Sequence, residues 1–211
     1  AMLGNGRYSL SDHFPPSVIV RDTTFDSTQL DTTDVSDCLS FCAAPEYATR
    51  ISQNANIKAV ITTAELADRF SDKCGVVTSI EPLLAFYRVH NFVAETQCHD
   101  NCISGIDATA SVHPSAQISP RSYIGRNSRV DAHAVILDRV YIDDGAIIGP
   151  NVVVGSDGLE FKRLPDGTLL KVCHAGGVYV GKHVEIMASS VIARDVFYVF
   201  ISIGDGTKIV L

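Results

Sequence analysis

The sequence lacks any apolar run that approaches the roughly 18 residues needed to cross a membrane, and no basic-then-apolar leader opens it. It is also short of positive charge, because 17 Lys and Arg residues stand against 24 Asp and Glu residues, a net charge of −7. Surfaces for nucleic acid or anionic lipid need an excess of Lys and Arg, so this balance argues against both partners. We therefore expect a soluble, cytoplasmic protein with no membrane span and no nucleic-acid partner.

The six cysteines come without an export signal, which predicts reduced thiols rather than a disulfide framework. Cys38 and Cys42 have the spacing of one helix face. The segment 98–102, Cys-His-Asp-Asn-Cys, resembles half of a metal site, but zinc needs four ligands and the next candidate, His90, falls in a predicted helix. We therefore predict no metal and no other cofactor.

The chain does contain an uninterrupted six-residue repeat. An Ile or Val recurs every sixth position, and a small or compact residue follows four places after each. The aliphatic positions are Ile106, Val112, Ile118, Ile124, Val130, Ile136, Ile142, Ile148 and Val154. This period fits neither an amphipathic helix nor one long strand. It predicts a hexapeptide β-helix, in which each phrase forms one short strand and one turn.

Core and turn positions agree with this interpretation. Stiff β-branched side chains fill a narrow interior, so the aliphatic residue should point inward. Two places later a fixed φ of about −65° would start the turn, and this position carries Pro114, Pro120 and Pro150. The next position should tolerate positive φ, and it carries Asn127, Gly145, Asn151 and Asp157. Three phrases, about 18 residues, should complete one coil.

The two halves of the chain differ in pattern, which predicts two domains. Residues 8–96 have the pattern of a small α/β domain. Its predicted strands lie at 17–20 and 58–62 and its predicted helices at 45–53, 63–70 and 82–94. A polar linker should occupy 97–105. The β-helix should occupy 106–211, with an inserted loop at 159–177 and a second irregularity at 197–202. Insertions in a solenoid often project from its binding face.

Four phrases carry a family resemblance. They are Cys-Leu-Ser-Phe-Cys-Ala-Ala-Pro-Glu-Tyr at 38–47, Gly-Ser-Asp-Gly at 155–158, Gly-Gly-Val-Tyr-Val-Gly at 176–181 and Ile-Gly-Asp-Gly-Thr-Lys-Ile at 203–209. In this order they resemble the UDP-3-O-acylglucosamine N-acyltransferases of lipid A synthesis. The resemblance implies a left-handed parallel β-helix, a homotrimer with active sites between subunits, and an acyl carrier protein thioester as the acyl donor.

The resemblance also implies a uridine site in the amino-terminal domain. Phe41 and Tyr47 match two aromatic residues that hold a uracil ring between them, and such stacking contributes about 1–3 kcal/mol. The alternative is that Phe41 belongs to the core and Tyr47 lies on a helix surface. The family usually places an Asn between the rings, where this chain has Ala44, so uridine specificity stays open. A substrate loop is implied at Gly155, Ser156, Asp157 and Gly158.

The implied reaction moves a 3-hydroxyacyl group from acyl carrier protein to the amine of a UDP-linked glucosamine derivative, without a metal. A His takes the amine proton, and backbone N–H groups hold the oxyanion. The family places this His in a Gln-Ile-Ala-His-like phrase that would fall beyond Leu211, and an Asp-Asn pair where this chain has Val210 and Leu211. We therefore expect residues 1–211 to be inactive by themselves, as a truncated product or a divergent paralogue.

Inside the chain, His174 in the insertion is the best candidate for a catalytic base. His113, His133 and His183 occupy turn positions and should face solvent. Two other functions remain open. One is an acetyl-CoA-dependent acetyltransferase that acts on an amino sugar of a surface polysaccharide. The other is a non-catalytic trimeric scaffold that binds a nucleotide sugar.

Overall fold

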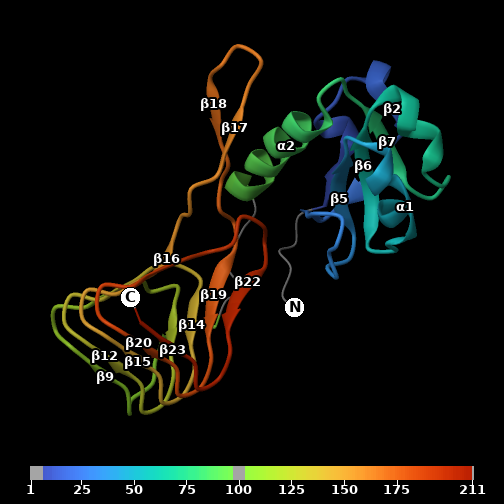
Figure 1. Cartoon of the computed structure of the whole chain (residues 1–211). Helices are drawn as coiled ribbons and strands as arrows, with labels where there is room; N and C mark the ends of the chain where they lie inside the picture. The colour runs from blue at the N-terminus through green and yellow to red at the C-terminus, as the bar shows by residue number, and fades with distance from the viewer. Residues whose placement is uncertain (1–6, 97–102, 211) are drawn as a thin grey trace. The chain divides into compact units, whose positions relative to one another are not determined.

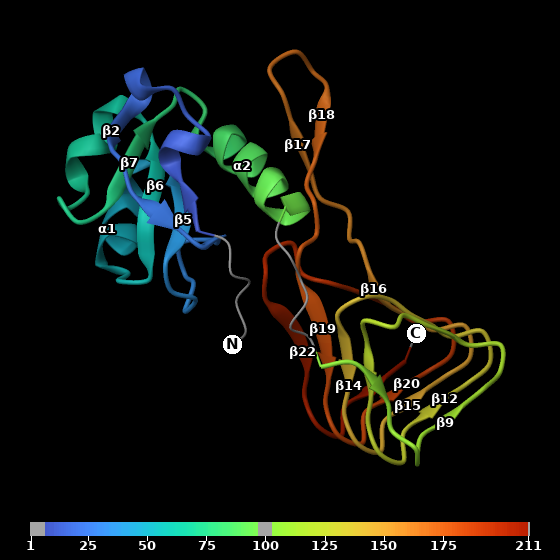
Figure 2. The same ribbon diagram turned by 180° about the vertical axis from the view of Figure 1, so that it is seen from behind.

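The computed structural model describes residues 7–96 and 103–210. They form two compact units, of which the first combines residues up to 96 with Glu160–Cys173. The second combines the segment from 103 to Leu159 with the segment from His174 onward. Figures 1 and 2 show a sheet with helices in one unit and a stack of β-coils in the other. The predicted fold class, a left-handed parallel β-helix preceded by a small α/β region, is confirmed.

The first unit is built on a five-stranded sheet with the order β2-β7-β6-β5-β4. Four of its strands run parallel: β4 (Ser27–Thr28), β5 (Cys38–Cys42), β6 (Ile57–Thr62) and β7 (Gly75–Thr78). Strand β2 (Ile19–Arg21) pairs antiparallel with β7, and the short strands β1 (Tyr8–Ser9) and β3 (Thr24–Phe25) pair with each other. The helices are α1 (Pro45–Gln53) and α2 (Pro82–Thr96), with 3-10 turns at Leu10–Asp12, Pro16–Val18 and Ala64–Arg69.

The two helices cover opposite faces of this sheet. Successive residues of a strand point to opposite sides, and β5 shows this directly. Cys42 packs with Ala48 and Ile51 of α1. The ring of Phe41 instead contacts Phe86 of α2, with 5.1 Å between the ring centroids.

One sequence-based expectation for this unit was wrong, and two were right only in part. Cys38 and Cys42 lie in strand β5 and not on a helix, because a spacing of four places two side chains on one face of either element. The helix expected at 63–70 is a 3-10 helix, Ala64–Arg69. The strand expected at 17–20 begins as the 3-10 turn Pro16–Val18, whose first position is a proline, and becomes β2 only at Ile19.

The second unit stacks its strands into three parallel sheets, one for each side of the coil. The first contains β8 (Gly105–Ile106), β11 (Tyr123–Ile124), β14 (Val140–Ile142), β19 (Gly177–Val180) and β22 (Phe200–Ile203). The second contains β9 (Ser111–Val112), β12 (Arg129–Val130), β15 (Ile147–Ile148), β20 (Glu185–Ile186) and β23 (Lys208–Ile209). The third contains β10 (Gln117–Ile118), β13 (Val135–Ile136), β16 (Val153–Ser156) and β21 (Val191–Ala193). Each aliphatic residue pairs with the one three phrases later, as Ile106, Ile124 and Ile142 do, so the predicted coil length is confirmed.

The aliphatic residues point into the coils, as predicted. Those from Ile124 to Val154 are at most 1% exposed. Ile106 is 52% exposed because it lies at the end of the described stack. Burial in the interior is therefore set by neighbouring coils and not by residue type alone.

Left-handed backbone at the turns is more widespread than the residue types predict. Asn127, Gly145 and Asn151 have positive φ, as expected. The same hexad position also has positive φ at His133, Arg139, His183 and Ser189. Asp157, expected to join them, does not. The pairing of β16 shifts register between Val154 and Ser156, so the regular turn is lost there.

A ladder of tyrosines runs along the first of these sheets. Tyr123, Tyr141 and Tyr179 are in register, and their rings stack at centroid distances of 4.7 and 5.3 Å. The hydroxyl of Tyr179 donates a hydrogen bond to Asp143 Oδ2 at 2.6 Å. This bond to a carboxylate raises the pKa of Tyr179 to about 12.

Asp143→Asn is expected to lower the pKa of Tyr179 toward the usual value of about 10. Folding favours the neutral phenol, so its stabilisation is complete below the usual tyrosine pKa and is lost as pH rises toward 12. Ultraviolet titration of the wild type and the Asp143→Asn variant, each compared with its Tyr179→Phe counterpart, measures this shift. An unchanged Tyr179 titration in Asp143→Asn would contradict the role of the hydrogen bond.

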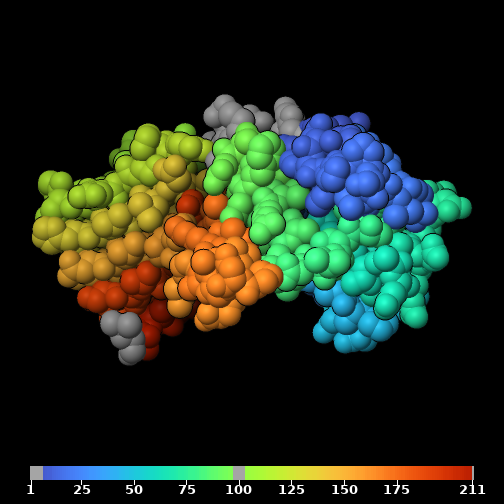
Figure 3. All heavy atoms as spheres, turned by 90° about the horizontal axis from the view of Figure 1, so that it is seen from above, coloured from blue at the N-terminus to red at the C-terminus, as the bar shows by residue number. Residues whose placement is uncertain are grey.

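The insertion forms a β-hairpin. Strand β17 (Phe161–Arg163) pairs antiparallel with β18 (Leu169–Lys171). Asn91 on α2 donates through Nδ2 to the Lys171 carbonyl at 2.7 Å, and its Oδ1 accepts the Cys173 N–H at 2.9 Å. Figure 3 shows the hairpin, in orange, against the green helix α2. The inserted segment thus extends the first unit.

Candidate functional site

The two aromatic residues of the predicted uridine site stand where the chain leaves the sheet after β5. Phe41 is half-buried, and its ring lies 5.1 Å from Phe86 and 6.4 Å from Tyr87, centroid to centroid. Tyr47, in the first turn of α1, is 45% exposed, and the Arg50 guanidinium carbon lies 5.4 Å from its ring. Both residues therefore belong to the carboxyl edge of the parallel strands, the edge at which open α/β sheets bind ligands.

A cavity of about 640 Å³ lies at the ends of the two neighbouring strands. Thr63 directly follows β6 and Ser79 directly follows β7, and both line it. Phe14 and Val18, from the segment before β2, form another part of its wall. No sequence pattern indicated this cavity, because its shape depends on how a distant segment packs against the strand ends.

In the β-helix, the structure brings together two predicted site features, the Gly-Ser-Asp-Gly loop and His174. A Cβ placed on Gly158 would lie 2.9 Å from His174 Nε2, so the imidazole packs directly on the glycine backbone. His174 is 8% exposed, and its Nδ1 has no hydrogen-bond partner among the described residues. The approach requires a residue without a side chain at position 158.

Two arginines that the sequence analysis missed hold the segments around this loop. Arg194 donates through Nε and Nη2 to Asp157 Oδ1, at 2.9 and 2.6 Å, and its backbone N–H donates to the Ser156 carbonyl. Arg139 is 4% exposed, and its guanidinium carbon lies 3.8 Å from the centre of the Tyr198 ring. Arg139 thereby ties the second irregularity to the coil beneath it, and Arg194 ties the segment before that irregularity to the Gly-Ser-Asp-Gly loop. Each pair depends on the stacking of coils, which no local pattern encodes.

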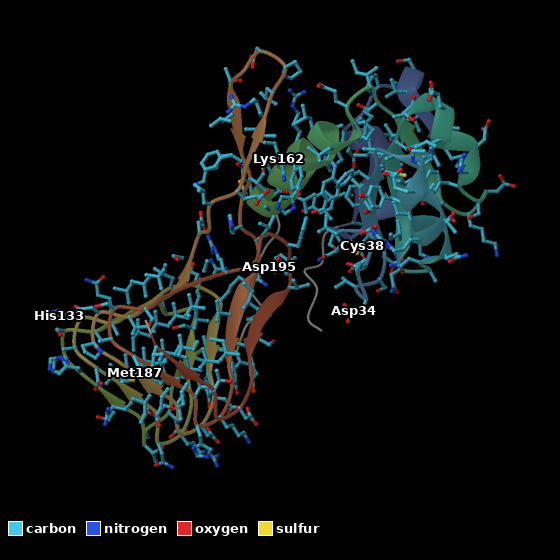
Figure 4. The ribbon with its side chains drawn as sticks, viewed as in Figure 1. Asp34, Cys38, His133, Lys162, Met187 and Asp195 are labelled. Carbon is cyan, nitrogen blue, oxygen red and sulfur yellow. The ribbon has the colours of Figure 1, made fainter. Side chains whose placement is uncertain are left out.

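The remaining predicted positions are peripheral. His113, His133 and His183 are exposed at turns, and Figure 4 shows His133 at an outer corner of the coils. Within residues 7–96 and 103–210, no three His, Cys, Asp or Glu side chains are grouped to hold a metal ion. The Cys-His segment at 98–102 lies outside the described residues. No helix in the described ranges is long and apolar enough to cross a membrane.

Comparison with known proteins agrees with this architecture. The family described as "Bacterial transferase hexapeptide (six repeats)" matches residues 121–156. A UDP-3-O-acylglucosamine N-acyltransferase from Pseudomonas putida is 29% identical over 198 residues, which cover 81% of this chain and 55% of that protein. One from Campylobacter lari is 28% identical over 195 residues, or 81% of this chain and 59% of that protein. The chain resembles the UDP-3-O-acylglucosamine N-acyltransferases.

The resemblance to these N-acyltransferases, first indicated by four short phrases, is confirmed. A shorter match, 33% identical over 87 residues, is to UDP-3-O-acylglucosamine N-acyltransferase 1 of Francisella tularensis, covering 41% of this chain and 25% of that protein. The chain spans a little over half the length of the Pseudomonas and Campylobacter relatives.

Proposed function

We propose that this chain is part of an N-acyltransferase that acts on a UDP-linked glucosamine derivative in lipid A synthesis. The acyl group would come from an acyl carrier protein thioester. The observation that carries the proposal is a match to these N-acyltransferases that covers 81% of the chain, too much for either structural unit alone. A repeat by itself would support only the wider acyltransferase class.

In this proposal the first unit binds the nucleotide. The half-buried ring of Phe41 and the exposed ring of Tyr47 offer flat apolar faces beside the carboxyl edge of the sheet. A uracil ring stacks on such faces because every base has a π-face. Ala44, between the two rings in sequence, has no polar side chain to read the edge of the base.

The β-helix would support the acyl transfer. The amine nitrogen attacks the thioester carbonyl, the N–C bond forms, the C–S bond breaks, and the leaving thiolate receives a proton. A base must remove the proton that the amine loses. His174 is 8% exposed and packed on Gly158, so a substrate amine has little access to it. We therefore propose that His174 is not this base and that residues 1–211 by themselves bind substrate without turnover.

Phe41→Ala is expected to weaken uridine and UDP binding by about tenfold or more, because it removes a stacking surface worth about 1–3 kcal/mol. Tyr47→Ala should have a similar effect. Isothermal titration calorimetry measures both. Phe92→Ala, which removes another 49% exposed ring of the same unit, is the matched control and should bind like the wild type. Failure of the wild type to bind any uridine nucleotide would overturn the nucleotide site.

Donor identity can be tested with the same protein. Residues 1–211 are assayed with a UDP-linked amino sugar and either a 3-hydroxyacyl carrier protein thioester or acetyl-CoA. We expect no turnover with either donor. Turnover with the carrier protein that disappears in His174→Ala would identify His174 as the base. Turnover with acetyl-CoA alone would contradict the lipid A proposal and favour the acetyltransferase alternative.

We also propose that the β-helix self-associates as a homotrimer. Val135, Val153 and Val191 are neighbours in register on the outward side of β13, β16 and β21, and Val191 is 62% exposed. Burying such a stripe between copies removes apolar surface from water. A monomer mass by light scattering at micromolar concentration would contradict this assembly.

A further inference from the structure

The hairpin brings a lysine to the aromatic cluster that contains Phe41. Lys162, in the middle of β17, has its Nζ 4.5 Å from the centroid of the Tyr87 ring. The Tyr87 ring lies 6.4 Å from that of Phe41. Figure 4 shows Lys162 beside α2, the helix that carries Tyr87. A single aromatic ring therefore separates the ammonium group from Phe41.

The position of Lys162 is fixed by the hairpin. Residues alternate across β17, so Lys162 lies on one face with its cross-strand partner Leu170, while Arg163 lies on the other face and is exposed. The stem is held on α2 by Asn91 and by His90, whose Nε2 lies 2.9 Å from the Cys173 carbonyl oxygen. The lysine is therefore in place before any ligand arrives.

Lys162 is charged in this setting. Its side chain is 22% exposed, and Nζ lies 2.5 Å from Glu160 Oε1. Burial by itself favours the neutral amine, but the hydrogen bond to Glu160 and the adjacent Tyr87 together hold the pKa of Lys162 above its usual value. An ammonium group has three N–H donors, so Glu160 and Tyr87 leave capacity for an anionic ligand.

We propose that Lys162 binds the diphosphate of the nucleotide whose base stacks on Phe41. This inference rests on the proposed function, because it takes the nucleotide site at Phe41 as its starting point. The ribose of a nucleoside diphosphate separates base from phosphates by a gap comparable to one ring. Ala44 offers the base no side-chain hydrogen bond, so the charge of Lys162 adds polar recognition at the diphosphate. The ligand class is a nucleoside diphosphate or its sugar conjugate.

The test compares UDP with uridine, which lacks the phosphates, by titration calorimetry on the whole chain. Lys162→Met is expected to weaken UDP binding about tenfold, the usual effect of losing one charge-assisted hydrogen bond, and to leave uridine binding unchanged. Lys162→Arg, which keeps the charge, should recover most of the UDP affinity. Arg163→Met removes the neighbouring charge on the opposite face and is expected to bind both ligands like the wild type.

The possible outcomes distinguish a failure of this inference from a failure of the proposed nucleotide site. If Lys162→Met weakens UDP and uridine equally, or weakens neither, Lys162 supports the hairpin and does not bind phosphate. If Arg163→Met weakens UDP as much as Lys162→Met, the effect is general electrostatic attraction, and the inference is again overturned. If the wild type binds neither ligand, the nucleotide site fails, and this inference fails with it. If Lys162→Met unfolds at the temperature of the titration, Lys162→Gln is titrated with UDP and with uridine at a lower temperature instead. The same outcomes then apply.

Discussion

Gly176→Ala is expected to destabilise the β-helix by about 3 kcal/mol or more, the scale of severe overpacking. A Cβ at position 176 would lie 2.5 Å from the Phe197 carbonyl oxygen and 2.6 Å from that of Val199. Both are backbone atoms of the second irregularity, so no rotamer change relieves the clash. The Gly176 N–H also donates to the Asp195 carbonyl at 3.0 Å, which prevents the two segments from separating freely.

Thermal denaturation measures this effect. A loss of that size lowers the melting temperature by roughly 6–12 °C in a chain of this length. Gly204→Ala is the matched control, because the nearest atom to its Cβ would be Thr207 Oγ1 at 4.0 Å. Equal melting temperatures for the two variants would show that the close approach at Gly176 is relieved by a backbone shift.

His90→Leu is expected to destabilise the first unit by a comparable amount, about 3 kcal/mol, because it removes the ring that hydrogen-bonds both the buried Thr28 hydroxyl and the partly buried Cys173 carbonyl. His90 is 1% exposed. Its Nε2 lies 2.9 Å from the Cys173 carbonyl oxygen, and its Nδ1 lies 2.6 Å from Thr28 Oγ1. A carbonyl only accepts, so Nε2 carries a proton and donates it to the Cys173 carbonyl, while Nδ1 pairs with the Thr28 hydroxyl. The ring thereby joins β4, α2 and the hairpin stem.

Amide hydrogen exchange resolves the consequence by segment. The backbone amides of β17 and β18 should exchange faster in His90→Leu, because the hairpin stem loses a contact with α2. His113→Leu is the control. His113 is an exposed turn residue, and within the described residues its ring hydrogen-bonds to nearby Ser115. Unchanged exchange in the hairpin would mean that its other contacts with α2, such as those of Asn91, hold the stem without His90.

Local patterns in the sequence accounted for the coils well and for the turns less completely. The inward position is marked by a β-branched residue in every phrase, so its burial from Ile124 to Val154 was predictable. Positive φ at Arg139 and Ser189 was not predictable from residue type, because neither favours it. At these turns the packing of neighbouring coils, and not the residue type, determines the left-handed backbone conformation.

Some residues of the candidate site carry a signal in the sequence, and others do not. Phe41, Tyr47 and the Gly-Ser-Asp-Gly loop were found by resemblance of short phrases, and the packing of His174 on Gly158 places two of the predicted features together. Arg194 and Arg139 were not predicted, because single basic residues in a loop carry no periodic signal. Cys38 and Cys42 were misassigned because a spacing of four is shared by helix and strand faces.

A period of six residues was sufficient to specify the β-helix, because each inward side chain and each turn lies within one short phrase and recurs in the next. The tertiary structure alone decided that the interruption of this repeat forms a hairpin on α2 and carries Lys162 to the ring of Tyr87. That contact joins segments distant in the chain. It exists because the side-chain alternation of β17 and the hydrogen bonds of His90 and Asn91 select one packing of the hairpin.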